Sequence, residues 1–257
     1  MPPFFNQWCN VTDHKVGSHR VRVLTEKPGV RPSVTPSLDE AVLDNYDEVG
    51  RLERWAVQLG LPNAAAVLRE IFPTEVRARS GHVGEVLLTE SIPELFPGFI
   101  VPIKRLRWLD GRNMHLRGED FIGIDNRAGH IRFLKAESKS RMSLKAKVVS
   151  EARAALNANG GRPSAHAMLF IAKRLEEIGE SALSSIFLDY ALKNQMQETQ
   201  LVHLVFTLSG NDCTELLRND LEAYAGTVQQ QAVGLVISDH QDFILGIYTR
   251  LTDAAQH

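Results

Sequence analysis

The sequence predicts an α/β protein in which helices pack against a mixed central sheet. Three observations predict this class. Two apolar arms joined by a turn, within residues 119–139, indicate a β-hairpin. An apolar, β-branched run at 201–210 is typical of a buried strand in a parallel sheet. Several segments around these strands carry apolar residues at helical spacing.

Composition excludes several classes of protein. The 257 residues are 44% hydrophobic and 23% charged, which is typical of a globular chain of one large or two small domains. Two cysteines exclude a disulfide framework and a cysteine-rich zinc site, and the nine histidines show no HxH or HExxH spacing. No Walker motif, secretory signal or membrane-spanning run is present. We expect a reduced, cytoplasmic protein.

The N-terminal part begins with an extended region over 1–36 that contains one alternating apolar run. Ser37 and Glu40 have the spacing of a capping box and predict a helix over 37–60. A second, short helix is expected over 63–72, before the next proline.

The later part supplies the main sheet. The expected order is helix 80–92, strand 100–109, hairpin arms 119–125 and 131–139, helices 142–161, 164–179 and 180–194, strand 201–210, helix 211–226, and strands 232–239 and 243–251. We therefore predict that 1–75 is an N-terminal accessory region. Residues 76–257 would form the core with C-terminal additions.

Charge is distributed unevenly along the chain. The net charge is −2, but residues 100–147 contain twelve basic and five acidic residues and carry +7. The remainder therefore carries −9. A basic region around a few acids suits a polyanion held against a metal site. A solvated charged surface explains the same charge run and stays open as an alternative.

The hairpin carries the sharpest functional signal. Strand side chains alternate, so Glu137 and Lys139 share one face of the second arm. Asp120 shares a face with Ile122 and Ile124 in the first arm, and a hairpin brings it close to Glu137 if the register allows. The two carboxylates repel each other unless a cation lies between them.

These residues form a set suited to phosphodiester hydrolysis. Mg²⁺ (or Mn²⁺) prefers one or two carboxylates, a carbonyl and several waters. Asp120, Glu137 and the backbone carbonyl of Ser138 are the expected ligands, and Lys139 would orient the attacking water or stabilise the developing charge.

Each residue also has a simpler interpretation. Glu137 and Lys139 could form a solvent-facing ion pair of little energetic value, and Asp120 could be a hairpin residue or cap. Glu119 is an alternative ligand, but alternation directs its side chain to the opposite face, outward. No His–Asp pair activates a serine nucleophile.

The pattern D…ExK across a hairpin resembles the PD-(D/E)XK nuclease superfamily. Glu119 stands where the literal motif has proline. Many members carry a further glutamate on the preceding helix, and the resemblance implies this role for Glu85; an exposed helix position is the alternative. It also implies a restriction-endonuclease-like fold with the order α-β-β-β-α-β, in which Glu85 supports the metal directly or through water.

The segments RSGHVGEVLLTE, LRGEDFIGID and FLKAESKSR resemble the HamA family, the nuclease subunits of the Hachiman antiphage defence system, over about residues 80–215. This resemblance implies a metal-dependent DNA endonuclease with little sequence preference, held in check by a HamB-like helicase in a hetero-complex. The apolar segment 243–251 could serve as a docking surface. A non-catalytic DNA-binding or helicase-tethering module with the same fold is the alternative.

Overall fold

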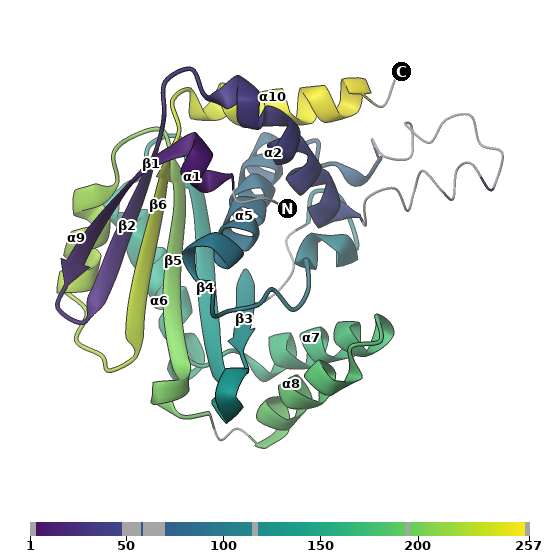
Figure 1. Ribbon diagram of the computed structural model, residues 1–257, viewed down its shortest axis with the longest axis vertical. Helices are drawn as coiled ribbons and strands as arrows, with labels where there is room; N and C mark the ends of the chain where they lie inside the picture. Colours follow the sequence, from purple (N-terminus) through teal and green to yellow (C-terminus); the bar gives the residue numbers. More distant parts are fainter. Residues whose placement is uncertain (1–3, 48–57, 59–69, 115–117, 194–195, 255–257) are drawn as a thin grey trace.

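A computed structural model describes residues 4–47, 58, 70–114, 118–193 and 196–254. Its centre is a six-stranded sheet with the order β1-β2-β6-β5-β4-β3 (Figure 1). The strands are β1 (Cys9–Val16), β2 (His19–Glu26), β3 (Phe121–Asp125), β4 (Arg132–Arg141), β5 (Leu201–Ser209) and β6 (Gln229–Val236). The predicted α/β class is confirmed.

The sheet is mixed in strand direction. Strands β2, β6, β5 and β4 are parallel to one another, whereas β1 and β3 pair antiparallel with β2 and β4 at the two edges. Every residue of β5 is buried, as expected for a central strand covered on both faces. The hairpin predicted over 119–139 is confirmed as β3 and β4.

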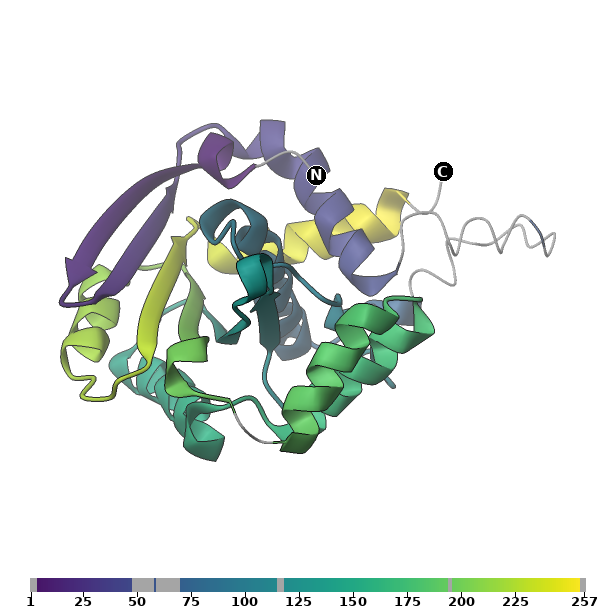
Figure 2. The same ribbon diagram turned by 60° about the horizontal axis from the view of Figure 1, so that its bottom comes forward.

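Helices cover both faces of the sheet (Figures 1 and 2). The α-helices are α1 (Phe5–Trp8), α2 (Arg31–Tyr46), α5 (Val76–Leu95), α6 (Ala146–Asn157), α7 (Ala165–Glu177), α8 (Ser181–Lys193), α9 (Thr214–Glu222) and α10 (His240–Ala254). Short 3-10 helices are η1 (Arg105–Trp108), η2 (Arg127–Gly129), η3 (Ala158–Gly161) and η4 (Glu198–Gln200). Among the described residues, no helix has the length and apolar character needed to cross a membrane.

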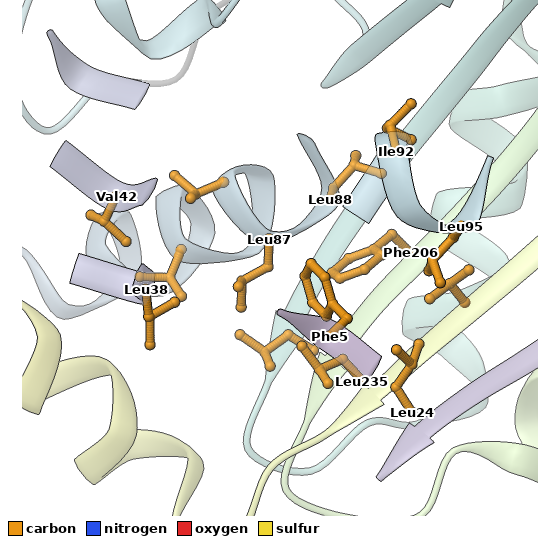
Figure 3. Close-up of a cluster of buried hydrophobic side chains, with 14 of the residues drawn as sticks. Phe5, Leu24, Leu38, Val42, Leu87, Leu88, Ile92, Leu95, Phe206 and Leu235 are labelled. Atoms are coloured by element: carbon orange, nitrogen blue, oxygen red, sulfur yellow. The ribbon is translucent and has the colours of Figure 1, made fainter. Parts of the chain in front are cut away.

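The largest apolar core lies between the sheet and the layer formed by α1, α2, α5 and α10. Leu87 and Leu88 of α5 meet Phe206 and Leu235 of the sheet there, with Phe5 beside them (Figure 3). A second core lies under α6 and α9, and a third joins α7 and α8 to Phe133 of β4. Each core buries one apolar helix face against one face of the sheet.

Two predicted strands are wrong. The segment 100–109 pairs with the sheet only at the bridge between Ile100 and Ile124, and then forms η1. Residues 243–251 lie in α10, where Phe243, Ile244, Ile247 and Tyr248 are buried. Their i, i+1, i+4, i+5 spacing places one apolar stripe against α5 and α2, which a strand could not do.

The N-terminal region contributes directly to the sheet. Residues 9–26 form β1 and β2, and β2 pairs with β6. Helix α2 begins at Arg31, earlier than predicted, with Pro32 in its first turn, where a missing amide proton is tolerated. The boundary at residue 75 stays a prediction. The helix predicted over 63–72 lies mostly outside the described residues.

Candidate active site

The candidate site lies where β4 continues beyond β3. The two strands pair from Phe121 opposite Ala136 to Asp125 opposite Arg132. Beyond Ala136, β5 is the only strand that pairs with β4 in the part of the chain that the structure describes, so the other edge of β4 is unpaired there and is called the open edge below. Glu137, Ser138 and Lys139 lie on this open segment, and Asp120 immediately precedes β3.

The register of the hairpin brings Asp120 and Glu137 together, which was the condition on the prediction. Continuing the register places Asp120 opposite Glu137, and Asp120 Oδ2 accepts a hydrogen bond of 2.8 Å from the Ser138 amide. The amide and carbonyl of one strand residue point to the same side. The Ser138 carbonyl is therefore directed toward this open edge, where it was expected as a ligand.

Lys139 lies beside Glu137. Its Nζ is 2.5 Å from Glu137 Oε1, and the two side chains are 21% and 13% exposed. This confinement distinguishes the pair from the freely solvated ion pair that stood as the simpler interpretation. In this arrangement the ammonium group partly neutralises the carboxylate that would serve as a metal ligand.

Glu85 approaches from the other layer. Gly84 of α5 lies so close to β4 that an added Cβ would be 2.9 Å from Ser138 Oγ. Ser80, one turn earlier, is hydrogen-bonded to Ser140, with 2.8 Å between the hydroxyl oxygens. This close crossing brings Glu85 near enough to raise the pKa values of both Asp120 and Glu137.

The electrostatics of the site favour a cation. Burial raises the pKa of Asp120 well above its usual value, and the charges of Glu85 and Glu137 raise it further. Burial also raises the pKa of Glu137, although Lys139 opposes that shift. A divalent cation would relieve both the repulsion and the desolvation cost.

The donor set fits Mg²⁺ with water completing its coordination. Among the residues that the structure describes, no three His, Cys, Asp or Glu side chains are close enough to form a preassembled metal cage. Two carboxylates and a carbonyl suffice for Mg²⁺, because it retains several waters. Asp120, Glu137 and Ser138 are therefore the residues that would hold the ion, with Glu85 at longer range.

Glu119 does not point outward, and that expectation is wrong. Its side chain is buried, and its two carboxylate oxygens accept hydrogen bonds from the backbone amide and hydroxyl of Ser164, at 2.7 and 2.9 Å. Gly118 has a φ of +96°, so the chain turns before β3 and strand alternation does not extend to Glu119. Glu119 therefore stabilises the N-terminus of α7.

Lys135 is a structural residue that the sequence reasoning did not single out. It is 1% exposed, and its Nζ donates hydrogen bonds to the carbonyls of Leu156, Ala158 and Arg162. The same Nζ is 3.6 Å from Glu119 Oε1. Its position between Phe133 and Glu137 on one strand face could have indicated that this lysine is buried. Together, Lys135 and Glu119 fix α6 and α7 around the base of the hairpin.

The basic segment is not one uniform cationic surface. Lys104 and Arg107 pair with Asp44, Arg127 pairs with Asp125, and Lys135 is buried. Exposed basic side chains remain just after Lys139, at Arg141, Lys145 and Lys147. Among the described residues of this segment, the exposed positive charge outside ion pairs is thus concentrated just after the end of β4.

A model of the HamA family matches residues 2–251 of this chain. The chain belongs to the HamA family. The match begins before β1 and ends within α10, so it includes the whole described sheet of this HamA family member.

A named protein is similar in sequence to part of the chain. The Hachiman protein HamA of Bacillus cereus is 24% identical over 153 residues, which cover 60% of this chain and 54% of that protein. The chain therefore spans about half the length of this curated HamA relative.

Proposed function

We propose that this chain is a metal-dependent DNA endonuclease, the effector subunit of an antiphage defence complex that a helicase partner holds in check. The observation that carries the proposal is the convergence of Asp120, Glu137 and Lys139 at the open edge of β4. The antiphage role and the partner rest on membership of the HamA family and on the likeness to a Hachiman protein.

The residues divide the chemical work. Asp120, Glu137 and the Ser138 carbonyl would hold Mg²⁺ or Mn²⁺, with Glu85 supporting them. When bound, such an ion polarises a phosphodiester and lowers the pKa of a coordinated water. The ammonium group of Lys139 orients the attacking water or stabilises the negative charge that develops on the phosphate oxygens. Asp120 is fixed for this task by its hydrogen bond from the Ser138 amide.

Backbone contacts would hold the substrate. Arg141, Lys145 and Lys147 follow Lys139 closely in the sequence, and their exposed side chains suit phosphate groups. Contacts to phosphates carry no sequence information, so cleavage should show little sequence preference. A nuclease without sequence preference endangers its own cell's DNA, which gives a chemical reason for control by a helicase partner.

Plasmid cleavage tests this proposal. The full chain is assayed with Mg²⁺, Mn²⁺ or EDTA, with and without a co-expressed helicase partner and ATP. Glu137→Gln and Lys139→Ala should each lower the cleavage rate by about 100-fold or more. Glu215→Gln and Lys173→Ala, at exposed helix positions, are the matched controls. Equal cleavage by Glu137→Gln and the wild type would contradict the assignment.

A non-catalytic DNA-binding or helicase-tethering module remains the second candidate. The short Lys139–Glu137 ion pair favours it, because the ammonium group already occupies one side of the expected metal ligand. This candidate predicts that the Glu137→Gln variant keeps the full protective function of the whole complex against phage, measured as plating efficiency.

A further inference from the structure

A cavity of about 720 Å³ lies at the end of β4, between the first turns of α5 and α10. Its lining includes Val76 and Arg77 of α5, Arg141 and Met142 at the end of β4, and Leu245 of α10. This volume falls in the range of small-molecule sites.

The floor of the cavity is a polar network. The hydroxyls of Ser80 and Ser140 are 2.8 Å apart, and Ser140 Oγ is 3.0 Å from His240 Nε2. Ser140 and His240 are both 4% exposed. These groups are held in place by one another, and they present hydrogen-bonding capacity at the base of the cavity.

The rim combines positive charge with apolar surface. Arg77 and Arg141 are exposed, with Asp242 the acidic residue that lines the same cavity. Val76, Met142 and Leu245 are 72%, 56% and 52% exposed, although each is large and apolar. The N-termini of α5 and α10 add partial positive charge to the same region.

The cavity adjoins the candidate active site. Arg141 lies two residues beyond Lys139 on β4, and the strand rise places it about 13 Å from Glu137. Because a nucleic-acid strand carries a phosphate every few ångströms, one strand can reach both places within a few nucleotides.

We propose that this cavity binds one unpaired nucleotide of the nucleic-acid strand on which the candidate site acts. The base enters between the apolar side chains of Met142 and Leu245, as extruded bases do in other pockets, and Arg77 and Arg141 contact the flanking phosphates. The inference rests on the proposed function, because it takes that function's substrate as the ligand.

Equilibrium binding tests the cavity separately from cleavage. The full chain is titrated, in EDTA, against fluorescein-labelled oligothymidylate and against an abasic oligomer of the same length, with anisotropy as the readout. Leu245→Asn, which removes the apolar surface without adding charge, should weaken oligothymidylate binding about fivefold or more and leave abasic binding unchanged. Arg77→Glu should weaken the binding of both oligomers.

Matched controls lie on the α7–α8 pair. Leu192→Asn replaces an apolar side chain that is 69% exposed, and Lys173→Glu makes the same charge change as Arg77→Glu at an exposed position. Both should bind like the wild type, and thermal unfolding confirms that each variant is folded.

The outcomes separate the two claims. Absence of cleavage by the wild type would count against the proposed function and would leave this binding result intact. Wild-type chain that binds neither oligomer would overturn the cavity assignment. The assignment would also be overturned if the Leu245 and Arg77 variants bound both oligomers as tightly as their controls. The same holds if these variants bound DNA normally but no longer bound a protein partner.

Discussion

The carboxylate of Asp120 accepts a hydrogen bond from the backbone amide of Ser138, on the part of β4 that β3 no longer covers. Through this bond the Asp120 side chain connects the two arms of the hairpin beyond their last paired residues, Phe121 and Ala136. It fixes a carboxylate at an open strand edge, next to Glu137. Without a metal ion, the two neighbouring carboxylates lower the stability of the fold, and this loss of stability can be measured.

Asp120→Asn should raise the thermal stability of the metal-free chain while abolishing cleavage. The raised pKa of Asp120 means that its charged form destabilises the fold at neutral pH. The amide oxygen of asparagine can still accept from Ser138. Each kcal/mol gained should raise the melting temperature in EDTA by about 2–4 °C.

Asp212→Asn is the control with the opposite sign. Hydrogen bonds from Thr214 lower the pKa of Asp212, so its charge stabilises the fold and the amide should lower the melting temperature. A fall in melting temperature for Asp120→Asn would show that the charge of Asp120 does not destabilise the metal-free fold.

Glu119→Ala should destabilise the chain by about 2–4 kcal/mol. The change removes both hydrogen bonds from Glu119 to Ser164 and leaves Lys135 without its nearby carboxylate. Urea-induced unfolding measures the loss. Ser164→Ala, which keeps the bond from its amide to Glu119, should cost about 1 kcal/mol. The interpretation fails if Ser164→Ala proves the more costly change.

Gly84→Ala should destabilise the crossing of α5 over β4 by about 1–3 kcal/mol. The new Cβ would be 2.9 Å from Ser138 Oγ and 3.3 Å from Ser140 Cβ, so the helix or the strand must shift. In a Ser138→Ala background the first clash disappears, and the cost should fall. A double-mutant cycle of unfolding free energies measures this coupling; strictly additive values would contradict the close contact.

His203 should make stability depend on pH between about 6.5 and 4. Burial lowers the pKa of His203 from 6.5 to about 4, against the opposing effect of its hydrogen bond to the Gly161 carbonyl. Lys135 and Arg153 lower this pKa further. Above pH 6.5 the ring is neutral in both states and contributes nothing. As the pH falls, the unfolded chain gains a proton that the folded chain excludes.

The resulting loss should reach about 3 kcal/mol near pH 4. The difference in unfolding free energy between wild type and His203→Gln isolates this contribution from the carboxylates. An NMR titration of the His203 ring gives the pKa directly, and a value near 6.5 would refute the prediction.

The local sequence pattern was sufficient to predict part of this structure. The hairpin and the buried strand β5 follow from strand alternation and turn residues alone. The pairing of Asp120 with Glu137 also needed the register of the two strands, which the sequence left open. Helix α7 begins after Ser164, close to the start predicted at residue 164. Pattern failed at residues 243–251, because aromatic and β-branched residues favour a strand locally, whereas the spacing of the buried ones fits a helix.

Long-range contacts decided the rest. Glu119 stabilises the start of α7 because the chain turns at Gly118, and Ser164, far along the sequence, presents its amide and hydroxyl there. Glu85 acts on Asp120 because Gly84 permits a close crossing of two layers. Neither contact has a signal within a few residues of its own position.

The sequence by itself determined which side chains share a strand face, since alternation is a property of the backbone. It also determined the class of chemistry that two carboxylates and a lysine can perform. Only the tertiary structure decided that β3 ends before β4 and that, among the described residues, no strand pairs with the edge of β4 beside these groups. It also decided that most neighbouring basic residues are paired or buried, because partners distant in sequence, such as Asp44, meet them only in the folded chain.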